Sequence, residues 1–154
     1  WKEYNAVASF ALNNLEDYAL ANRLAKRSID MNQNFGNTNV LAGVLKAEGK
    51  TDAAKKMRQE ALGYASNAQA NNYAYQLLNK GNTAEALEVF KFNAERFPED
   101  PNVHDSLGEA YHAAGDDKNA EASLRKSLSL NPPPNVRQNS LRVLSEMGVN
   151  TAKM

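Results

Sequence analysis

The chain has 154 residues, with 18 basic and 18 acidic side chains and a formal net charge of zero, so charge gives no reason to expect nucleic acid or an anionic membrane as a partner. It contains no cysteine, which excludes thiol nucleophiles, disulfides and thiolate metal sites. Apolar residues make up 42% of the chain and aromatic residues only 8%, a balance that favours closely packed helices over a β-sandwich. No stretch approaches the ~20 apolar residues of a membrane span, and we expect no membrane insertion.

Apolar residues recur at helical spacing along the whole chain, and no run alternates as a strand would. The sequence therefore predicts an all-α fold. The expected helices, in chain order, cover residues 2–14, 17–32, 36–48, 51–65, 67–80, 83–97, 101–114, 117–130 and 134–147.

The first four expected helices form two related helix-turn-helix segments, residues 2–34 and 35–66. In the second of them Gly49 lies in the turn, where a left-handed residue is favoured when it lacks a Cβ atom. In the first, Glu16 stands at the position of the turn glycine. These two copies of the pattern are less regular than those that follow.

The next two segments, residues 67–100 and 101–134, carry the pattern more clearly, because their turn glycines Gly81 and Gly115 are 34 residues apart. Asp100 followed by Pro101 predicts a helix start, with a side chain that caps the free N–H groups and a first residue that has no N–H. Small residues at Gly108 and Ala120 predict a close contact between the two helices of the last segment.

Residues 135–147 follow three consecutive prolines, which prevent the preceding helix from continuing. Leu141, Leu144 and Met147 place one apolar stripe on this final segment. We expect it to be a capping helix, because the last unit of a stacked array would otherwise expose its apolar face.

The segment 101–134 resembles a tetratricopeptide repeat. The family pattern W-x2-L-G-x2-Y, A-x3-F and P has a period of about 34 residues, and five of its seven positions hold the expected residue. In chain order these positions are His104, Leu107, Gly108, Tyr111, Ala120, Leu124 and Pro132. The resemblance implies a right-handed superhelix of four repeats and a capping helix, in one solenoid domain over residues 1–154, and it implies a non-catalytic module for protein–protein interaction.

In this family the inner face is lined by the first helix of each repeat, so aligned positions predict a binding groove. Asparagine recurs in one column of that face, and an amide that donates and accepts at once suits the backbone of an extended peptide. The predicted peptide-binding residues are Asn39, Asn71, Tyr75, Asp105, Glu109, His112 and Asn139. The alternative is that Asn39 and Asn71 cap their helices or are simply solvated.

Candidate chemical sites are few. Glu109 and His112 are spaced so that they could share a metal, but no second copy of the pair exists to build a centre with it, and His104 stands where the family packs a tryptophan. No phosphate-binding loop, nucleophile elbow or zinc-protease motif occurs. We expect no catalytic residues, no metal site and no cofactor.

A second resemblance is to the repeat tail that follows a small β-rich domain of unknown function in some exported bacterial proteins. It rests on the opening residues Trp1, Tyr4, Asn5 and Ala6 and on residues 100–103, 105–111 and 131–133. That resemblance implies a periplasmic or otherwise extracytoplasmic location, the alternative being cytoplasmic. The chain begins at Trp1 rather than methionine, so we expect a piece of a longer protein or a processed form. Two other roles stay open: a structural tail that contacts its own N-terminal domain or self-associates, and completion of an active site in a longer chain.

Overall fold

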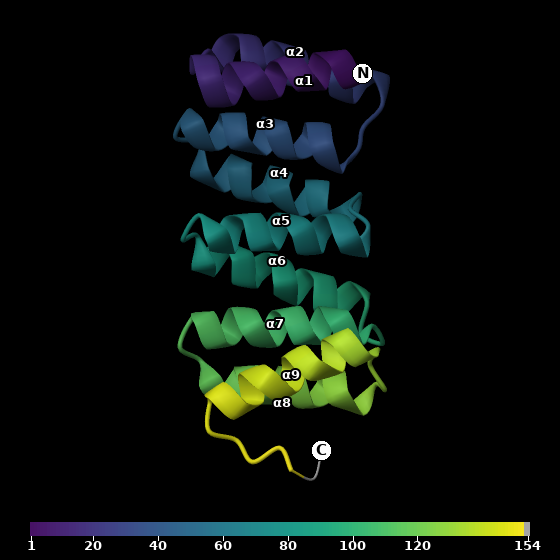
Figure 1. Cartoon of the computed structure of the whole chain (residues 1–154). Helices are drawn as coiled ribbons and strands as arrows, with labels where there is room; N and C mark the ends of the chain where they lie inside the picture. The colour runs from purple at the N-terminus through teal and green to yellow at the C-terminus, as the bar shows by residue number, and fades with distance from the viewer. Residues whose placement is uncertain (153–154) are drawn as a thin grey trace. The chain divides into compact units, whose positions relative to one another are not determined.

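The computed structural model describes residues 1–152 and is helical throughout, with no strand in that range (Figure 1). The chain divides into two compact units, Trp1–Ala65 and Ser66–Met154. The first contains α1 (Lys2–Phe10), the π-helical segment η1 (Ala11–Leu15), α2 (Tyr18–Met31), α3 (Phe35–Ala47) and α4 (Thr51–Gly63). The second contains α5 (Asn67–Asn79), α6 (Thr83–Arg96), α7 (Pro101–Ala113), α8 (Asp117–Ser129) and α9 (Pro134–Glu146).

The predicted all-α fold of helix-turn-helix pairs is confirmed, and most helix ends fall within a residue or two of the expected ones. The single solenoid over residues 1–154 remains a prediction. One local difference lies in the first helix, which keeps α-helical geometry only to Phe10 and then widens into η1. Another is α4, which ends at Gly63 instead of residue 65, because Ser66 is already the N-cap of α5.

The turn residues adopt the conformations that the sequence indicates. Gly49, Gly81 and Gly115 have φ angles of 76°, 77° and 76°. Glu16 has a φ of 52° and ends η1, so a side chain occupies the left-handed position that glycine fills elsewhere. The start of α7 is also as predicted, because the Asp100 carboxylate accepts a hydrogen bond from the Asn102 N–H at 2.9 Å.

Alanine builds much of the core in the first unit. Ala8 and Ala25 are fully buried against Leu41, and Val40 packs against the same cluster. Side chains this small let α1, α2 and α3 approach closely, so their larger neighbours fill the space around each contact. The core of this unit is therefore made of close helix crossings more than of large apolar side chains.

In the second unit α7 and α8 approach closely at Gly108. A Cβ atom on Gly108 would lie 2.5 Å from Leu124 Cγ and 3.3 Å from the Ala120 carbonyl oxygen. Helix α9 packs against both α7 and α8 (Figure 1), and Val143 and Leu144 form a buried cluster with Leu124. The final helix therefore covers the apolar face of the pair before it.

Candidate functional site

Six of the seven predicted groove residues lie on α5, α7 and α9 of the second unit. Hydrogen bonds join residues that are one repeat apart: Tyr75 to Glu109 and Asn139 to Asp105, each separated by 34 positions. The aligned columns of the sequence are thus neighbouring side chains on successive first helices. We refer to the surface that they form as the polar face of α5, α7 and α9.

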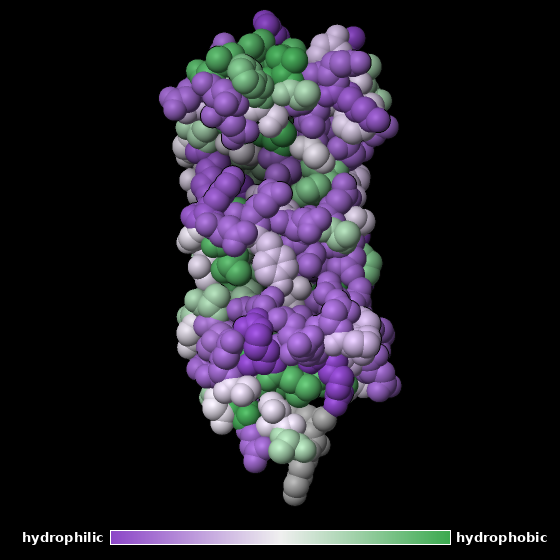
Figure 2. Space-filling model, viewed as in Figure 1, coloured by the Kyte–Doolittle hydropathy of each residue, from purple (hydrophilic) through white to green (hydrophobic). Residues whose placement is uncertain are grey.

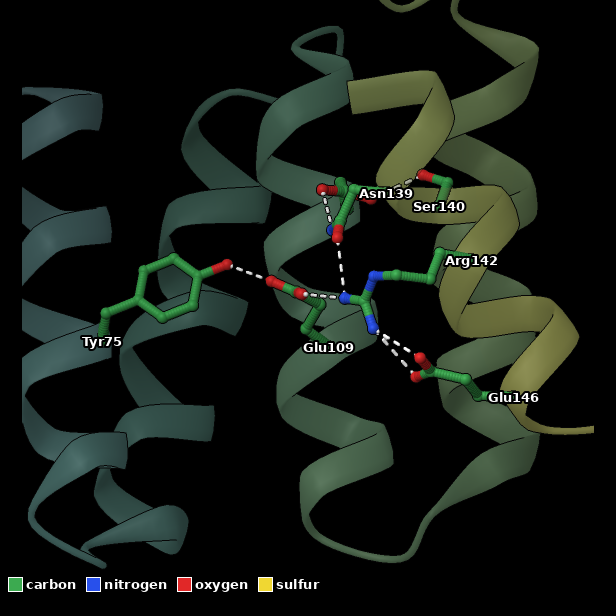
Figure 3. A network of polar contacts seen from close by, with 7 residues as sticks. Tyr75, Glu109, Asn139, Ser140, Arg142 and Glu146 are labelled. Atoms are coloured by element: carbon green, nitrogen blue, oxygen red, sulfur yellow. Dashed lines mark hydrogen bonds and ion pairs between the residues drawn. The ribbon is translucent and has the colours of Figure 1, made fainter. Parts of the chain in front are cut away.

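Tyr75 is held on two sides. Its hydroxyl donates a hydrogen bond to Glu109 Oε2 at 2.5 Å (Figure 3), and its ring packs edge-to-face on Phe90 with the centroids 5.0 Å apart. Burial, and then the Glu109 carboxylate, raise the pKa of Tyr75 above its usual range. The phenol therefore stays protonated and remains a hydrogen-bond donor in a fixed position.

Arg142 on α9 connects the carboxylates and amides of this face, and the sequence analysis did not single it out. Its guanidinium donates to Glu109 Oε1 at 3.2 Å, to Asn139 Oδ1 at 2.8 Å, and to both oxygens of Glu146 at 2.7 and 2.9 Å (Figure 3). The signal in the sequence was its spacing, three residues after Asn139 and four before Glu146, which places all three on one side of the helix.

Asp105 is the buried member of the network, with only 4% of its surface exposed. Its Oδ2 accepts from Asn139 Nδ2 at 2.8 Å, and its Oδ1 accepts from the Ser140 hydroxyl at 2.5 Å. The Ser140 oxygen also lies 3.3 Å from the Ser127 hydroxyl on α8. This carboxylate therefore links α7 to α9 instead of pointing into an open groove.

Burial raises the pKa of the Asp105 carboxyl, and the hydrogen bonds from Ser140 and Asn139 offset this only in part. A raised folded-state pKa means that the stability from this group is fully present below the unfolded-state pKa of about 3.9 and is lost as pH rises through the folded-state value. We therefore expect the free energy of unfolding of Asp105→Asn, measured by urea denaturation, to increase relative to that of the parent as the pH rises above the unfolded-state pKa of about 3.9. Asp52→Asn, at an exposed carboxyl, is the matched control. An equal gain in the control, or none at Asp105, would contradict this expectation.

Asn39 and Asn71 occupy the same position, the fifth residue, of α3 and α5. The caps of these helices are Asn34 and Ser66, each in a capping box, so the caps do not come from the two predicted asparagines. The Oδ1 atoms of Asn39 and Asn71 are buried and accept no hydrogen bond. Each unit thus has an amide oxygen without a donor on a first helix of a repeat.

Neither histidine contacts Glu109, the residue considered above as a metal-binding partner of His112. His112 Nδ1 lies 2.7 Å from Asp117 Oδ1 at the start of α8, and His104 Nε2 lies 2.7 Å from the Pro98 carbonyl oxygen. Because Glu109 is bonded to Tyr75 and Arg142, Glu109 and His112 have separate partners. Within residues 1–152, no group of three or more metal-ligating side chains converges, and no helix in that range is long and apolar enough to cross a membrane.

A second polar column was missed by the sequence analysis. Ser28, Asn93 and Ser127 lie near the ends of α2, α6 and α8 and are fully buried. Ser28 donates to the Trp1 carbonyl oxygen at 2.9 Å, and Asn93 Nδ2 donates to Asn67 Oδ1 at 2.8 Å. The sequence did carry a signal for this column, because a polar residue recurs near the end of three of the second helices. Ser28 and Asn93 tie helix ends together, and Ser127 contacts the polar face through Ser140.

Residues 102–134, which run from the second residue of α7 through α8 to the first residue of α9, match the tetratricopeptide repeat family. This segment is a tetratricopeptide repeat. The resemblance found in the sequence is confirmed for it, and the tetratricopeptide repeat is a non-enzymatic interaction module. Outside this segment, the export context and the N-terminal β-rich domain remain predictions.

Among solved structures, the chain is similar to a mutant of MamA, with 19% identical residues, 95% of this chain and 82% of that chain covered, and a TM-score of 0.49. It is also similar to MamA AMB-1, with 19% identical residues, 95% and 88% of the two chains covered, and a TM-score of 0.48. No curated protein matches the chain in sequence.

Proposed function

We propose that the chain is a non-catalytic interaction module that binds an extended segment of a partner protein along its first-helix faces. Tetratricopeptide repeats present such surfaces for protein partners, and residues 102–134 are one of them. In the second unit the binding surface is the polar face of α5, α7 and α9. In the first unit, Asn39 on α3 is the residue that would hydrogen-bond to the backbone of the partner.

The observation that carries this proposal is the amide oxygen of Asn71. A buried acceptor without a donor costs free energy of about 1–3 kcal/mol, and a backbone N–H of an extended peptide would supply the donor. Asn139, in the same column and 34 residues after Asp105, already has its amide bonded to Asp105 and Arg142. Asn71 is therefore the member of this column in the second unit whose amide oxygen has no donor within the described chain, and its amide has to turn outward to meet a peptide.

Tyr75 lies one helical turn from Asn71, and its orientation is fixed by Glu109 and Phe90. A ring that is already immobile loses little conformational entropy on binding, so it is a favourable anchor for a side chain of the partner. Because Arg142 neutralises Glu109 and Asp105 is buried, the face favours a polar, uncharged segment more than a basic one.

The test is a peptide-library screen, followed by titration of the best peptide into the parent, Asn71→Ala and Asn72→Ala. Asn72 is the same residue type in the next position of α5 and is exposed, so its replacement is the matched control. We expect Asn71→Ala to weaken binding roughly fivefold, the effect of one hydrogen bond of about 1 kcal/mol, and Asn72→Ala to have no effect. Equal affinities for all three proteins would place recognition elsewhere.

A structural role is the alternative, and one observation favours it. Tyr75, Asp105, Glu109 and Asn139 direct their hydrogen bonds to one another and to α9, which holds the final helix in place without any ligand. If no peptide binds the parent, the polar face would be a connection between helices.

We also propose an extracytoplasmic location, supported by the resemblance to the tails of exported bacterial proteins. Fractionation of cells that produce the full-length protein from its own gene would test it. Recovery of the protein in the cytoplasmic fraction alone would contradict the proposal.

A further inference from the structure

The charge of the polar face of α5, α7 and α9 depends on few residues. Helix α5 has no charged side chain, and the acidic residues of the three helices are Asp105, Glu109 and Glu146. The lysine and arginine residues of the same helices are Arg137 and Arg142. Figure 2 shows a band of hydrophilic residues over α7 and α9, in the lower part of the view. A small number of contacts therefore sets the charge that a partner meets there.

Arg142 is the cation of this face. Its Nη2 atom lies 3.2 Å from Glu109 Oε1, and its Nη1 atom lies 2.7 Å from Glu146 Oε1 (Figure 3). Burial raises the pKa of the Asp105 carboxyl, and the positive charge of Arg142 acts against this rise. One guanidinium thus acts on all three carboxylates.

Arg137 belongs to a different surface. It lines a cavity together with Arg125 and Leu128 of α8. Arg137 is five residues before Arg142, which is about 1.4 turns of an α-helix, so the two side chains leave α9 on different sides. Replacing either arginine with glutamine changes the charge of α9 by the same amount. Arg137 is therefore the matched control for Arg142.

The ion pair of Arg142 and Glu109 is within reach of a ligand. The exposed fraction of the side chain is 51% for Arg142 and 25% for Glu109. Tyr75, the proposed anchor for the partner, donates to the other oxygen of the same Glu109 carboxylate. A partner side chain that packs beside Tyr75 is therefore close to this carboxylate. A lysine there would be attracted to Glu109 if no arginine already neutralised it.

We infer that Arg142 determines the charge specificity of the polar face, because it neutralises Glu109 beside Tyr75 and so keeps the face from preferring basic segments. The inference rests on the proposed function, since it requires a partner segment on this face. Specificity of this kind comes from removing an attraction for the wrong partner. A residue that only held α9 in place would lower the stability of the protein and leave the preference unchanged.

The first experiment measures the charge of the face without any partner. Two small nitroxide probes, one carrying an amino group and one a hydroxyl group, enhance NMR relaxation of the protons that they approach. We expect Arg142→Gln to raise the effect of the cationic probe over that of the neutral probe roughly twofold at the protons of Tyr75 and Glu109. Arg137→Gln should leave this ratio unchanged there. An unchanged ratio in Arg142→Gln would overturn the inference.

The second experiment measures the preference itself. Two immobilised libraries of short random peptides differ only in the central residue, which is lysine in one and glutamine in the other. We expect Arg142→Gln to shift retention toward the lysine library roughly fivefold, the effect of one partly exposed ion pair of about 1 kcal/mol. Arg142→Lys and Arg137→Gln should keep the parental ratio. The Glu109→Gln/Arg142→Gln double variant should return to it, because it has lost both charges of the pair.

The outcomes separate this inference from the proposed function. Binding with the same ratio in the parent and in Arg142→Gln would overturn the inference and leave the proposed function standing. Retention of neither library by any of the proteins would contradict the proposed function, and the inference about its partner with it. Partial unfolding of a variant lowers its retention on both libraries equally, so it does not change the ratio. Thermal melts of each variant would measure that separate effect.

Discussion

Replacing Gly108 with leucine should lower the free energy of unfolding by about 1–3 kcal/mol or more. The Cβ atom alone would lie 2.5 Å from Leu124 Cγ and 2.7 Å from Leu124 Cδ2, and Leu124 is fully buried, so neither side chain has room to move. For a chain of this size the melting temperature should fall by roughly 2–4 °C for each kcal/mol. Thermal melts followed by circular dichroism would measure the effect.

Gly63 provides the control for this prediction. It is the last residue of α4, and nothing lies within 4 Å of an added Cβ atom, so Gly63→Leu should change stability by less than about 0.5 kcal/mol. The contact itself can be isolated with Leu124→Ala, which should cost less in the Gly108→Leu background than in the parent. Additive effects, or parent-like melting of Gly108→Leu, would show that Gly108 does not form the crossing of α7 and α8.

Ending the chain at Asn131, so that α9 is removed, should lower the melting temperature strongly or cause aggregation. Val143 and Leu144 are 2% and 0% exposed, and burying a side chain of this size contributes about 1.5–3 kcal/mol each. The truncation also exposes the Leu124 cluster and removes both donors from Asp105. Thermal melts and light scattering of the truncated chain would measure both consequences.

Two substitutions on α9 serve as graded controls for the truncation. Leu144→Ala should cost about 2–5 kcal/mol because it leaves a cavity, whereas Ser145→Ala, on the exposed side of the same helix, should stay within about 0.5 kcal/mol of the parent. A truncated chain as soluble and stable as the parent would mean that α9 is an appendage and not a cap.

The sequence by itself determined the helices, the turns and the close approach of two helices at Gly108. These features have local causes: a left-handed glycine such as Gly81 ends a helix by its backbone freedom, and Asp100 before Pro101 starts one. The contact at Gly108 was also predictable, because a small residue at a fixed repeat position indicates that a neighbouring helix passes close to it. The sequence likewise identified which first-helix positions form columns.

Only the tertiary structure decided which side chains of those columns hydrogen-bond to one another and which have no partner within the described chain. The aligned residues Asp105 and Asn139 looked equally open to a peptide, yet they bond to each other, because the stacking distance and rotamers bring carboxylate and amide together. Asn71, in the same column, keeps an amide oxygen without a donor. The exposure of Phe10 on α1 was equally hidden, since periodicity marks an apolar face but does not say whether a neighbouring helix covers it.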